Sequence, residues 1–246
     1  MGRATVAGGN PAMSVPSAGV KASELAVGSS VYLLENGVPV EFLVVNQGKP
    51  SGSSLYDDSC NGVWLLRKLV TDSSMWASGK DYASSNVNTD LNQKYLSRFT
   101  ANTREQIKTA KIPYFVGVLN SGSVASGENG VSAKVFLLSA CEVGRTPSQA
   151  GNGIPADGAS VSYFANTATK DEKRIAYYDD GLAKIWWLRT PLTNSVNGSS
   201  VNAWHVNADG GLSTANKSQF YALRPALILP SDATFDEKTM ILKEVG

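Results

Sequence analysis

Side chains able to act as acids, bases or nucleophiles are scarce in this sequence. His205 is the single histidine among 246 residues, so any Ser-His-Asp or Cys-His arrangement would have to use it. Neither Cys60 nor Cys141 lies in a recognisable nucleophile motif, and the sequence has no Gly-x-Ser-x-Gly turn. A lone histidine in an alternating strand is more often a surface or contact residue than a base. We therefore predict no catalytic residues and no enzyme activity.

Metal and cofactor sites have equally little support. Imidazole sites need more than one histidine, and hard cations need clustered carboxylates. Asp57-Asp58 and Asp179-Asp180-Gly181 are the candidate pairs, and adjacent aspartates before glycine are common turn chemistry. No Gly-x-Gly-x-x-Gly or Gly-x-x-x-x-Gly-Lys loop is present. We expect no metal and no cofactor, with a structural calcium ion at an aspartate pair as the open alternative.

The bulk composition argues against several kinds of partner. The formal net charge is +1, from 22 basic and 21 acidic side chains, so we expect no nucleic-acid partner. No stretch approaches the roughly 20 apolar residues of a membrane span, and the N-terminus lacks the apolar core of a secretory signal. We expect synthesis in the cytoplasm, no membrane insertion, and two buried free thiols at Cys60 and Cys141.

The elements that would position these residues indicate an α+β fold with mainly antiparallel strands and two helices. Apolar runs at Ser30 to Leu34 and Val40 to Val45 flank Asn36-Gly37, which is a hairpin signal. Pro225 falls inside the apolar run Ala222 to Leu229, so that strand is expected at a sheet edge or with a bulge. Further strands are expected at Gly62 to Leu66, Val135 to Leu138 as a central strand, Ile185 to Leu188, Val201 to Val206 and Ala222 to Leu229.

Both helices are expected between residues 88 and 110. The first is indicated by apolar side chains that share one helical face, namely Leu91, Tyr95, Leu96 and Phe99. Asn88 or Thr89 is placed to cap it. The second is expected to start at Thr103, because Thr103 and Gln106 have the spacing of a capping box.

The chain divides into an arm and one domain. Residues 1–24 are rich in Gly, Ala, Ser and Pro and have few large apolar side chains. Such a composition buries too little surface to offset the entropy of ordering. We predict a flexible N-terminal arm over residues 1–24, able to dock to a neighbour, and a single domain over residues 25–246.

One segment, residues 192–221, has an unusual composition. Small polar residues dominate it, and Trp204, His205, Phe220 and Tyr221 are interleaved with them. Antibody paratopes have this composition, because aromatic rings supply contact area while Asn, Ser and Gly supply adaptable hydrogen bonds. Apolar strands flank the segment on both sides. Their arginines, Arg189 and Arg224, are expected to meet carboxylates or backbone carbonyls rather than ligand.

The flanking strands also carry a resemblance. Trp187-Leu188-Arg189-Thr190-Pro191 and Leu223-Arg224-Pro225-Ala226-Leu227 are similar to the Trp-Leu-Arg-Ser-Pro and Gly-Val-Arg-Pro-Ala-Leu motifs of a family of bacterial and prophage proteins of uncharacterised activity. Thr190 replaces the family's serine, and Ala222-Leu223 stands where Gly-Val is usual. The resemblance extends over about residues 28–229 and includes the blocks 42–50, 56–66, 111–114, 135–144, 202–204 and 206–210.

This resemblance implies a C-type-lectin-like fold. Some relatives are targets of diversity-generating retroelements, which replace adenines so that asparagine codons become hypervariable. Such replacement in AAC or AAT codons cannot produce Trp, Lys or Gln, so Trp204, Lys217 and Gln219 would be fixed. The ligand-binding positions that we predict are Asn194, Asn197, Ser199, Asn202, Trp204, His205, Asn207, Ser213, Ala215, Asn216, Ser218, Phe220 and Tyr221.

Three functions are compatible with these patterns. The leading hypothesis is a non-enzymatic, phage- or prophage-encoded variable protein on a virion or cell surface, which binds an unknown protein or glycan on a cell. The second is a structural virion or surface component, in which the segment is an assembly interface and the arm contacts another copy or a virion partner. The third is an enzyme related to the formylglycine-generating enzymes, but Cys60 and Cys141 lie outside the C-terminal block and do not match their cysteine arrangement.

Overall fold

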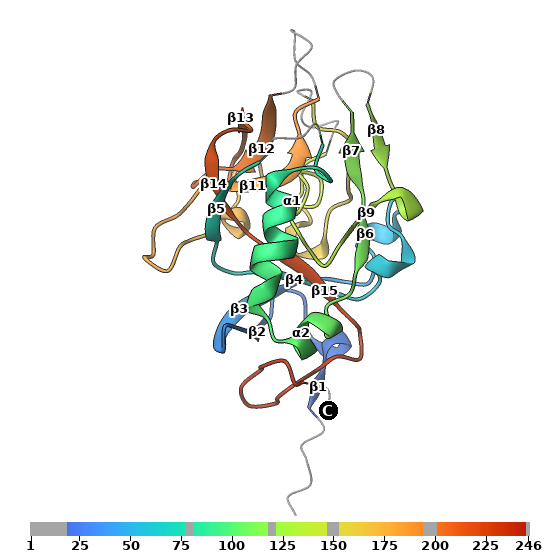
Figure 1. The fold of residues 1–246 in the computed structure, drawn as a ribbon, viewed down its shortest axis with the longest axis vertical. Helices are drawn as coiled ribbons and strands as arrows, with labels where there is room; N and C mark the ends of the chain where they lie inside the picture. Colours follow the sequence, from blue (N-terminus) through green and yellow to red (C-terminus); the bar gives the residue numbers. More distant parts are fainter. Residues whose placement is uncertain (1–18, 77–80, 118–121, 147–152, 194–200, 245–246) are drawn as a thin grey trace, which may run out of the picture.

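The computed structural model describes residues 19–76, 81–117, 122–146, 153–193 and 201–244 (Figure 1). Two five-stranded sheets form its centre. The first sheet contains, in spatial order, β10 (Val135–Phe136), β15 (Ala226–Leu229), β4 (Val63–Arg67), β3 (Val38–Gln47) and β2 (Ser30–Glu35). The second contains β13 (Leu212–Asn216), β12 (Asn202–Val206), β11 (Trp186–Pro191), β14 (Phe220–Leu223) and β5 (Thr71–Met75).

Three short strand pairs complete the β-structure of the described residues. They are β1 (Val20–Lys21) with β16 (Thr234–Phe235), β6 (Ala110–Ile112) with β9 (Val131–Ala133), and β7 (Tyr114–Val116) with β8 (Ser123–Ala125). Among the named strands, β11 and β14 pair in parallel and the other pairs are antiparallel. The predicted mixture of helices and mainly antiparallel strands is confirmed.

The hairpin β2–β3 forms where the sequence predicts it. Asn36 and Gly37 have φ values of 50° and 80°, and both lie in the left-handed region that a tight two-residue turn requires. Strand β4 also forms at the predicted place.

Two other strand predictions are wrong in detail. The run Val135 to Leu138 is buried throughout, but only Val135–Phe136 forms a strand, and it lies at the edge of the first sheet. Ala222 to Leu229 does not form one strand, because Pro225 has no N–H and separates β14 from β15. These two strands belong to different sheets, and β15 lies between β10 and β4.

Both predicted helices are present with earlier starts. The first is α1 (Asn86–Asp90), which continues as a helical segment to Arg98. Its N-cap is Ser85, whose hydroxyl accepts a hydrogen bond from Asn88 N (3.2 Å). The predicted caps, Asn88 and Thr89, lie inside the helix instead. The second is α2 (Ala101–Gln106), capped by Thr100. Thr103, the predicted start, lies inside its first turn.

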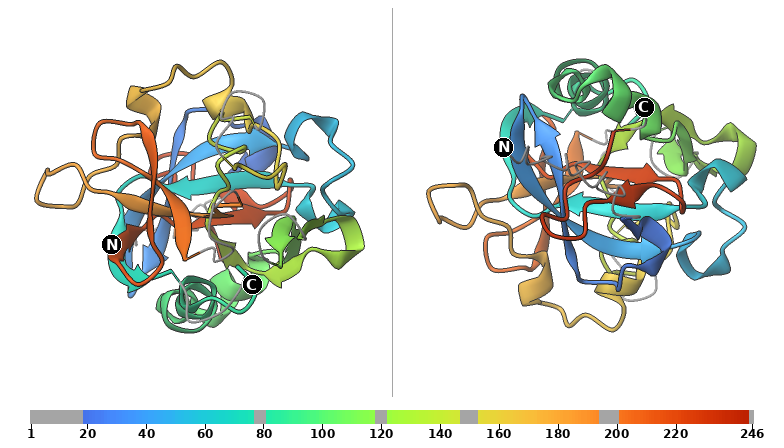
Figure 2. Two further views of the ribbon diagram at one scale, coloured as in Figure 1. Left: turned by 90° about the horizontal axis from the view of Figure 1, so that it is seen from above. Right: turned by 90° about the horizontal axis from the view of Figure 1, so that it is seen from below.

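Apolar side chains pack on both faces of the two sheets. One cluster includes Leu91 and Tyr95 of the helical segment, so the helices cover this side. The opposite cluster includes Val143, Val161 and Phe164, which belong to a long segment without regular strands or α-helices. Figure 2 shows the helices in green and this segment in yellow on opposite sides of the strands. Among the described residues, no helix is long and apolar enough to cross a membrane.

The N-terminal part of the chain is ordered before residue 25. Residues 1–18 of the predicted arm lie outside the described residues. Strand β1 pairs with β16, and Ala22 is fully buried. This strand pair therefore ties the beginning of the described chain to a late strand, at the end of the molecule away from β12 and β13 (Figure 1).

Candidate ligand-binding surface

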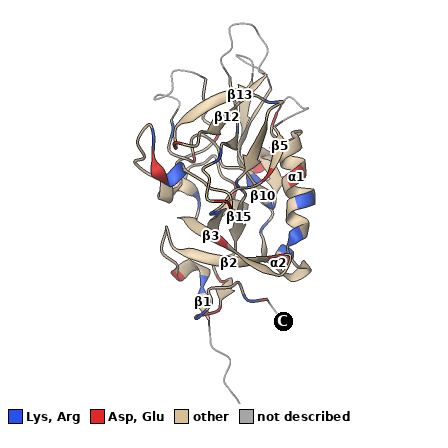
Figure 3. Cartoon of the chain, turned by 90° about the vertical axis from the view of Figure 1, so that its left-hand side faces the viewer, with Lys and Arg blue, Asp and Glu red and all other residues tan. Residues whose placement is uncertain are grey.

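The segment that composition singles out forms β12, β13 and the start of β14. Strands β12 and β13 pair from Asn202 opposite Asn216 to Val206 opposite Leu212. Neither strand contains Lys, Arg, Asp or Glu, and Figure 3 accordingly draws both in tan. Three of the predicted ligand-binding residues lie outside the described residues: Asn194, Asn197 and Ser199.

The turn between β12 and β13 sets their register. Asn207 N donates to Gly211 O (2.8 Å), and Gly210 N donates to Asn207 O (3.0 Å). Gly210 has a φ of 78°, and a Cβ at this position would lie 2.2 Å from the Asp171 carbonyl oxygen. Glycine is therefore required here, both for the left-handed conformation and for the close approach.

Side-chain alternation divides the predicted ligand-binding residues between two faces of the second sheet. His205 lies opposite Ser213 on β13 and opposite Trp187 on β11. The rings of His205 and Tyr221 are 5.0 Å apart, so Tyr221 shares this face. Ala215 packs against the same cluster as Trp187. The predicted residues His205, Ala215 and Tyr221 therefore lie on the same face of the second sheet, beside Trp187.

Trp204 faces the other way. It is 3% exposed and packs in the opposite cluster with Trp186 and Leu188. It is therefore a core residue and does not face a ligand. Of the remaining predicted residues, Asn216, Ser218 and Phe220 are exposed, whereas Asn202, Asn207, Ser213, Ala215 and Tyr221 are half-buried.

His205 is buried, contrary to the prediction of an exposed contact residue. Its exposure is 4%, because β12 lies between β11 and β13 and its ring packs edge-on against Trp187 and Tyr221. Burial lowers the pKa of His205, although the contact from Nε2 to Asn207 Oδ1 (2.9 Å) opposes this shift. A neutral imidazole fits this site. The ring of His205 thus contacts both Asn207 and Tyr221.

One predicted ligand-binding residue, Phe220, lies at a cavity. Its side chain is 64% exposed, an unusual degree for a large aromatic ring. The cavity has a volume of about 390 Å³ and lies where the edge strand β5 meets α1. Its lining consists of Ser73, Ser74, Met75, Asn86, Thr89, Asp90, Lys94 and Phe220.

Polar and charged groups also line this cavity. Asp90 Oδ1 forms an ion pair with Lys94 Nζ (2.8 Å), and Asp90 Oδ2 accepts a bond from Ser74 Oγ (2.6 Å). The Lys94 side chain is 76% exposed, so its ammonium group remains accessible from solvent. An aromatic ring beside fixed hydroxyl and charged groups suits a ligand with both apolar and polar parts.

The other residues that line this cavity were not predicted to bind ligand. Strand β5 reads Thr-Asp-Ser-Ser-Met, with no apolar run to indicate a strand. Its pairing with β14 becomes visible only in the tertiary structure.

A buried ionic cluster lies in the core behind β11. Arg189 Nη1 and Nη2 contact Glu142 Oε2 and Oε1 at 2.5 and 2.6 Å, and both side chains are fully buried. Glu142 also accepts bonds from Tyr56 Oη (2.7 Å) and Ser139 N (2.9 Å). The prediction that Arg189 meets a carboxylate is confirmed, and the bidentate pair of Arg189 and Glu142 has the features of a structural element.

Asp157 is the one acidic side chain of this region with an unmet oxygen. Its Oδ2 accepts from Thr190 Oγ1 (2.8 Å), but its buried Oδ1 has no hydrogen-bond partner among the described residues. Burial raises the pKa of Asp157 to about 7, against the opposing effect of Arg189. With this pKa, the charge of Asp157 changes near neutral pH.

Both thiols are buried and free, as predicted. Cys60 Sγ donates to Lys111 O (3.2 Å), and Cys141 Sγ donates to Pro155 O (3.4 Å). Burial raises the pKa of Cys60 to about 12 and raises that of Cys141 as well. Protonated thiols of this kind are poor nucleophiles.

The aspartate pairs act in turns. Asp57 accepts a bond from Ser59 N (2.9 Å), and Asp58 pairs with Lys49 (2.7 Å). Asp180 accepts from Leu182 N (2.8 Å). Within the described ranges, no group of three or more His, Cys, Asp or Glu side chains is arranged to hold a metal ion.

Comparison with known proteins found one family whose sequence model covers most of these strands. Residues 61–231 match the family described as Domain of unknown function (DUF6273). The chain belongs to this family. The DUF6273 match begins just before β4, ends just after β15 and includes the whole second sheet, whereas the hairpin β2–β3 precedes it. No curated protein and no solved structure was found to match the chain.

Proposed function

We propose that this chain is a non-enzymatic binding protein that recognises a protein or glycan on a cell surface through Phe220 and the cavity beside it. One observation supports this proposal above the others. Within the segment whose composition is typical of a paratope, Phe220 is 64% exposed and stands at a cavity of about 390 Å³. Aromatic anchors beside pockets commonly dominate binding energy at interfaces.

The surroundings of Phe220 favour a fixed scaffold with tolerant contacts. The rings of Trp187 and the buried His205 pack against the ring of Tyr221, the next residue in the chain. Exposed Asn216 and Ser218 precede Phe220 in the chain and can change without disturbing the core. This combination of rigid aromatic residues and adaptable polar residues suits recognition.

The finer proposal is a C-type-lectin-like variable protein of a phage or prophage, diversified by a retroelement and displayed on a virion or cell surface. It rests on the motif resemblance and on the position of the segment. The residue types that adenine replacement can produce lie mostly at exposed or half-buried positions of β12, β13 and β14. Of the three residues that it cannot produce, Trp204 and Lys217 are 3% and 6% exposed, whereas Gln219 is exposed and would be a constant contact residue.

A binding assay with labelled chain on a glycan array and on a panel of intact bacterial cells tests the proposal. We expect saturable binding to at least one target and a loss of affinity of about tenfold or more in Phe220→Ala, because a hot-spot aromatic contributes about 2 kcal/mol. Leu182→Ala is the matched control, since Leu182 is 60% exposed and does not line the cavity. Equal losses in both variants, or no effect of Phe220→Ala, would contradict the proposal.

A further inference from the structure

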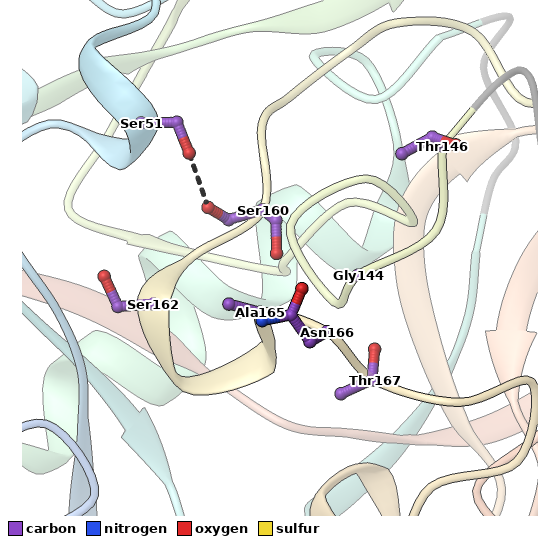
Figure 4. A pocket seen from close by; sticks show the side chains of 8 residues that line it. All are labelled: Ser51, Gly144, Thr146, Ser160, Ser162, Ala165, Asn166 and Thr167. Atoms are coloured by element: carbon purple, nitrogen blue, oxygen red, sulfur yellow. Dashed lines mark hydrogen bonds between the residues drawn. The ribbon is translucent and has the colours of Figure 1, made fainter.

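A second cavity lies on the side of the molecule away from the helices. It has a volume of about 440 Å³ and is formed by three segments: the turn at Pro50–Gly52, residues 144–146 and residues 160–167. Figure 4 shows the side chains around it. The lining residues are Ser51, Gly144, Thr146, Ser160, Ser162, Ala165, Asn166 and Thr167.

Two lining residues adopt an energetically unfavourable backbone conformation. Ser51 has a φ of 47° and Asn166 a φ of 60°, in the left-handed region that non-glycine residues rarely adopt. Ser51 Oγ donates to Ser160 O (3.2 Å), which joins two of the three segments across the cavity (Figure 4). Such outliers gather at functional sites, where the surrounding structure maintains them.

Two hydroxyl groups of the lining form hydrogen bonds with buried side chains. Ser162 donates from N and Oγ to Asn46 Oδ1 at 2.9 and 2.8 Å, and Asn46 is 2% exposed. Thr167 Oγ1 accepts a bond from Arg174 Nη2 (2.5 Å), and Arg174 is fully buried. The cavity is therefore built on ordered supports, which is the condition for a site of defined shape.

The lining also defines the chemistry of an occupant. No Asp, Glu, Lys or Arg is among the eight residues, and Ala165 is the largest wholly apolar side chain. Hydroxyl and amide groups both donate and accept hydrogen bonds, which matches a ligand that carries many hydroxyl groups.

We propose that this cavity binds a carbohydrate residue. Its volume of about 440 Å³ lies within the usual range for small-molecule sites. The site is separate from the Phe220 cavity: the two share no lining residue. A cell-surface glycan could thus be held at one site while Phe220 contacts another part of the target.

Amide NMR shifts during titration with glucose, galactose, mannose, N-acetylglucosamine and N-acetylneuraminic acid test this proposal. We expect at least one sugar to shift resonances of residues 144–146 and 160–167. Ala165→Tyr, which places a ring in the cavity from an exposed position, abolishes these shifts. Ala168→Tyr, at an exposed neighbour that does not line the cavity, retains them. The proposal fails if no sugar shifts these resonances or if Ala165→Tyr binds as the unaltered chain does.

A second variant separates binding from folding. Asn166→Gly removes the amide and also relieves the positive φ, so the midpoint of thermal unfolding is expected to stay unchanged or to rise. Sugar affinity is expected to fall about fivefold or more, because a hydrogen-bonding group is lost. Unchanged affinity would overturn the role of Asn166. Phe220→Ala should leave the sugar shifts intact, so failure of this site and failure of the Phe220 site are distinguishable.

Discussion

Arg189→Met is expected to lower the free energy of unfolding by about 3–5 kcal/mol, because it leaves Glu142 in the core without its ionic partner. Both side chains are fully buried, and Arg189 also donates to the backbone oxygens of Pro113, Leu137 and Asp157. Methionine fills a similar volume but supplies none of these donors. Urea unfolding at neutral pH measures the change.

Lys184→Met is the control for this variant. Lys184 pairs with Asp180 at 3.3 Å, but both side chains are partly exposed, at 33% and 48%. An exposed pair of this kind contributes at most about 1 kcal/mol. If Arg189→Met costs no more than Lys184→Met, the buried pair is not a main stabilising contact.

Asp157→Asn is expected to remove much of the pH dependence of stability between about pH 5 and about pH 8. Burial raises the pKa of Asp157 from its ordinary value of 3.8 to about 7, so the folded chain retains this proton to a higher pH than the unfolded chain. Ionisation therefore costs more in the folded chain, and the free energy of unfolding falls as pH rises toward 7. Over this interval the loss is on the order of 3 kcal/mol.

Urea unfolding of both chains at the two pH values measures this difference. Asparagine cannot ionise, so the variant should lack this part of the decrease. His205 works in the opposite direction, because its lowered pKa makes stability fall as pH drops below about 6.5. This effect is present in both chains and cancels in the comparison. The same decrease in both chains would show that Asp157 does not cause it.

Local patterns predicted the elements whose signals are local. The hairpin β2–β3 follows from Asn36-Gly37, and the first helix follows from the face that contains Leu91 and Tyr95. The helix starts were missed because Ser85 and Thr100 compete with later residues that also suit a cap. Cap chemistry alone does not decide which of several polar residues begins a helix.

Tertiary pairing accounts for the larger errors. The apolar run at Val135 to Leu138 predicts burial correctly, but burial does not determine pairing partners or the position in a sheet. His205 alternates with apolar residues, yet its strand is covered on both faces, so alternation did not imply exposure. The cavity beside Phe220 depends on β5 and α1, which are distant from it in sequence.

The segment of residues 192–221 was identified from composition, and the structure refines which of its residues can face a ligand. Asn216, Ser218 and Phe220 are exposed, whereas Trp204 and His205 are buried. Composition reports which residue types are present but not the face of the sheet on which they lie.

We propose that the segment of residues 192–221 is diversified for recognition. Deep sequencing of this locus in its source population, together with the adjacent DNA, tests it most directly. We predict substitutions concentrated at Asn202, Asn216, Ser218 and Phe220, and a near-copy template beside a reverse transcriptase gene. Trp204, Lys217 and Gln219 should be constant. Silent changes spread evenly along the chain, or frequent replacement of Trp204, Lys217 and Gln219, would contradict this proposal.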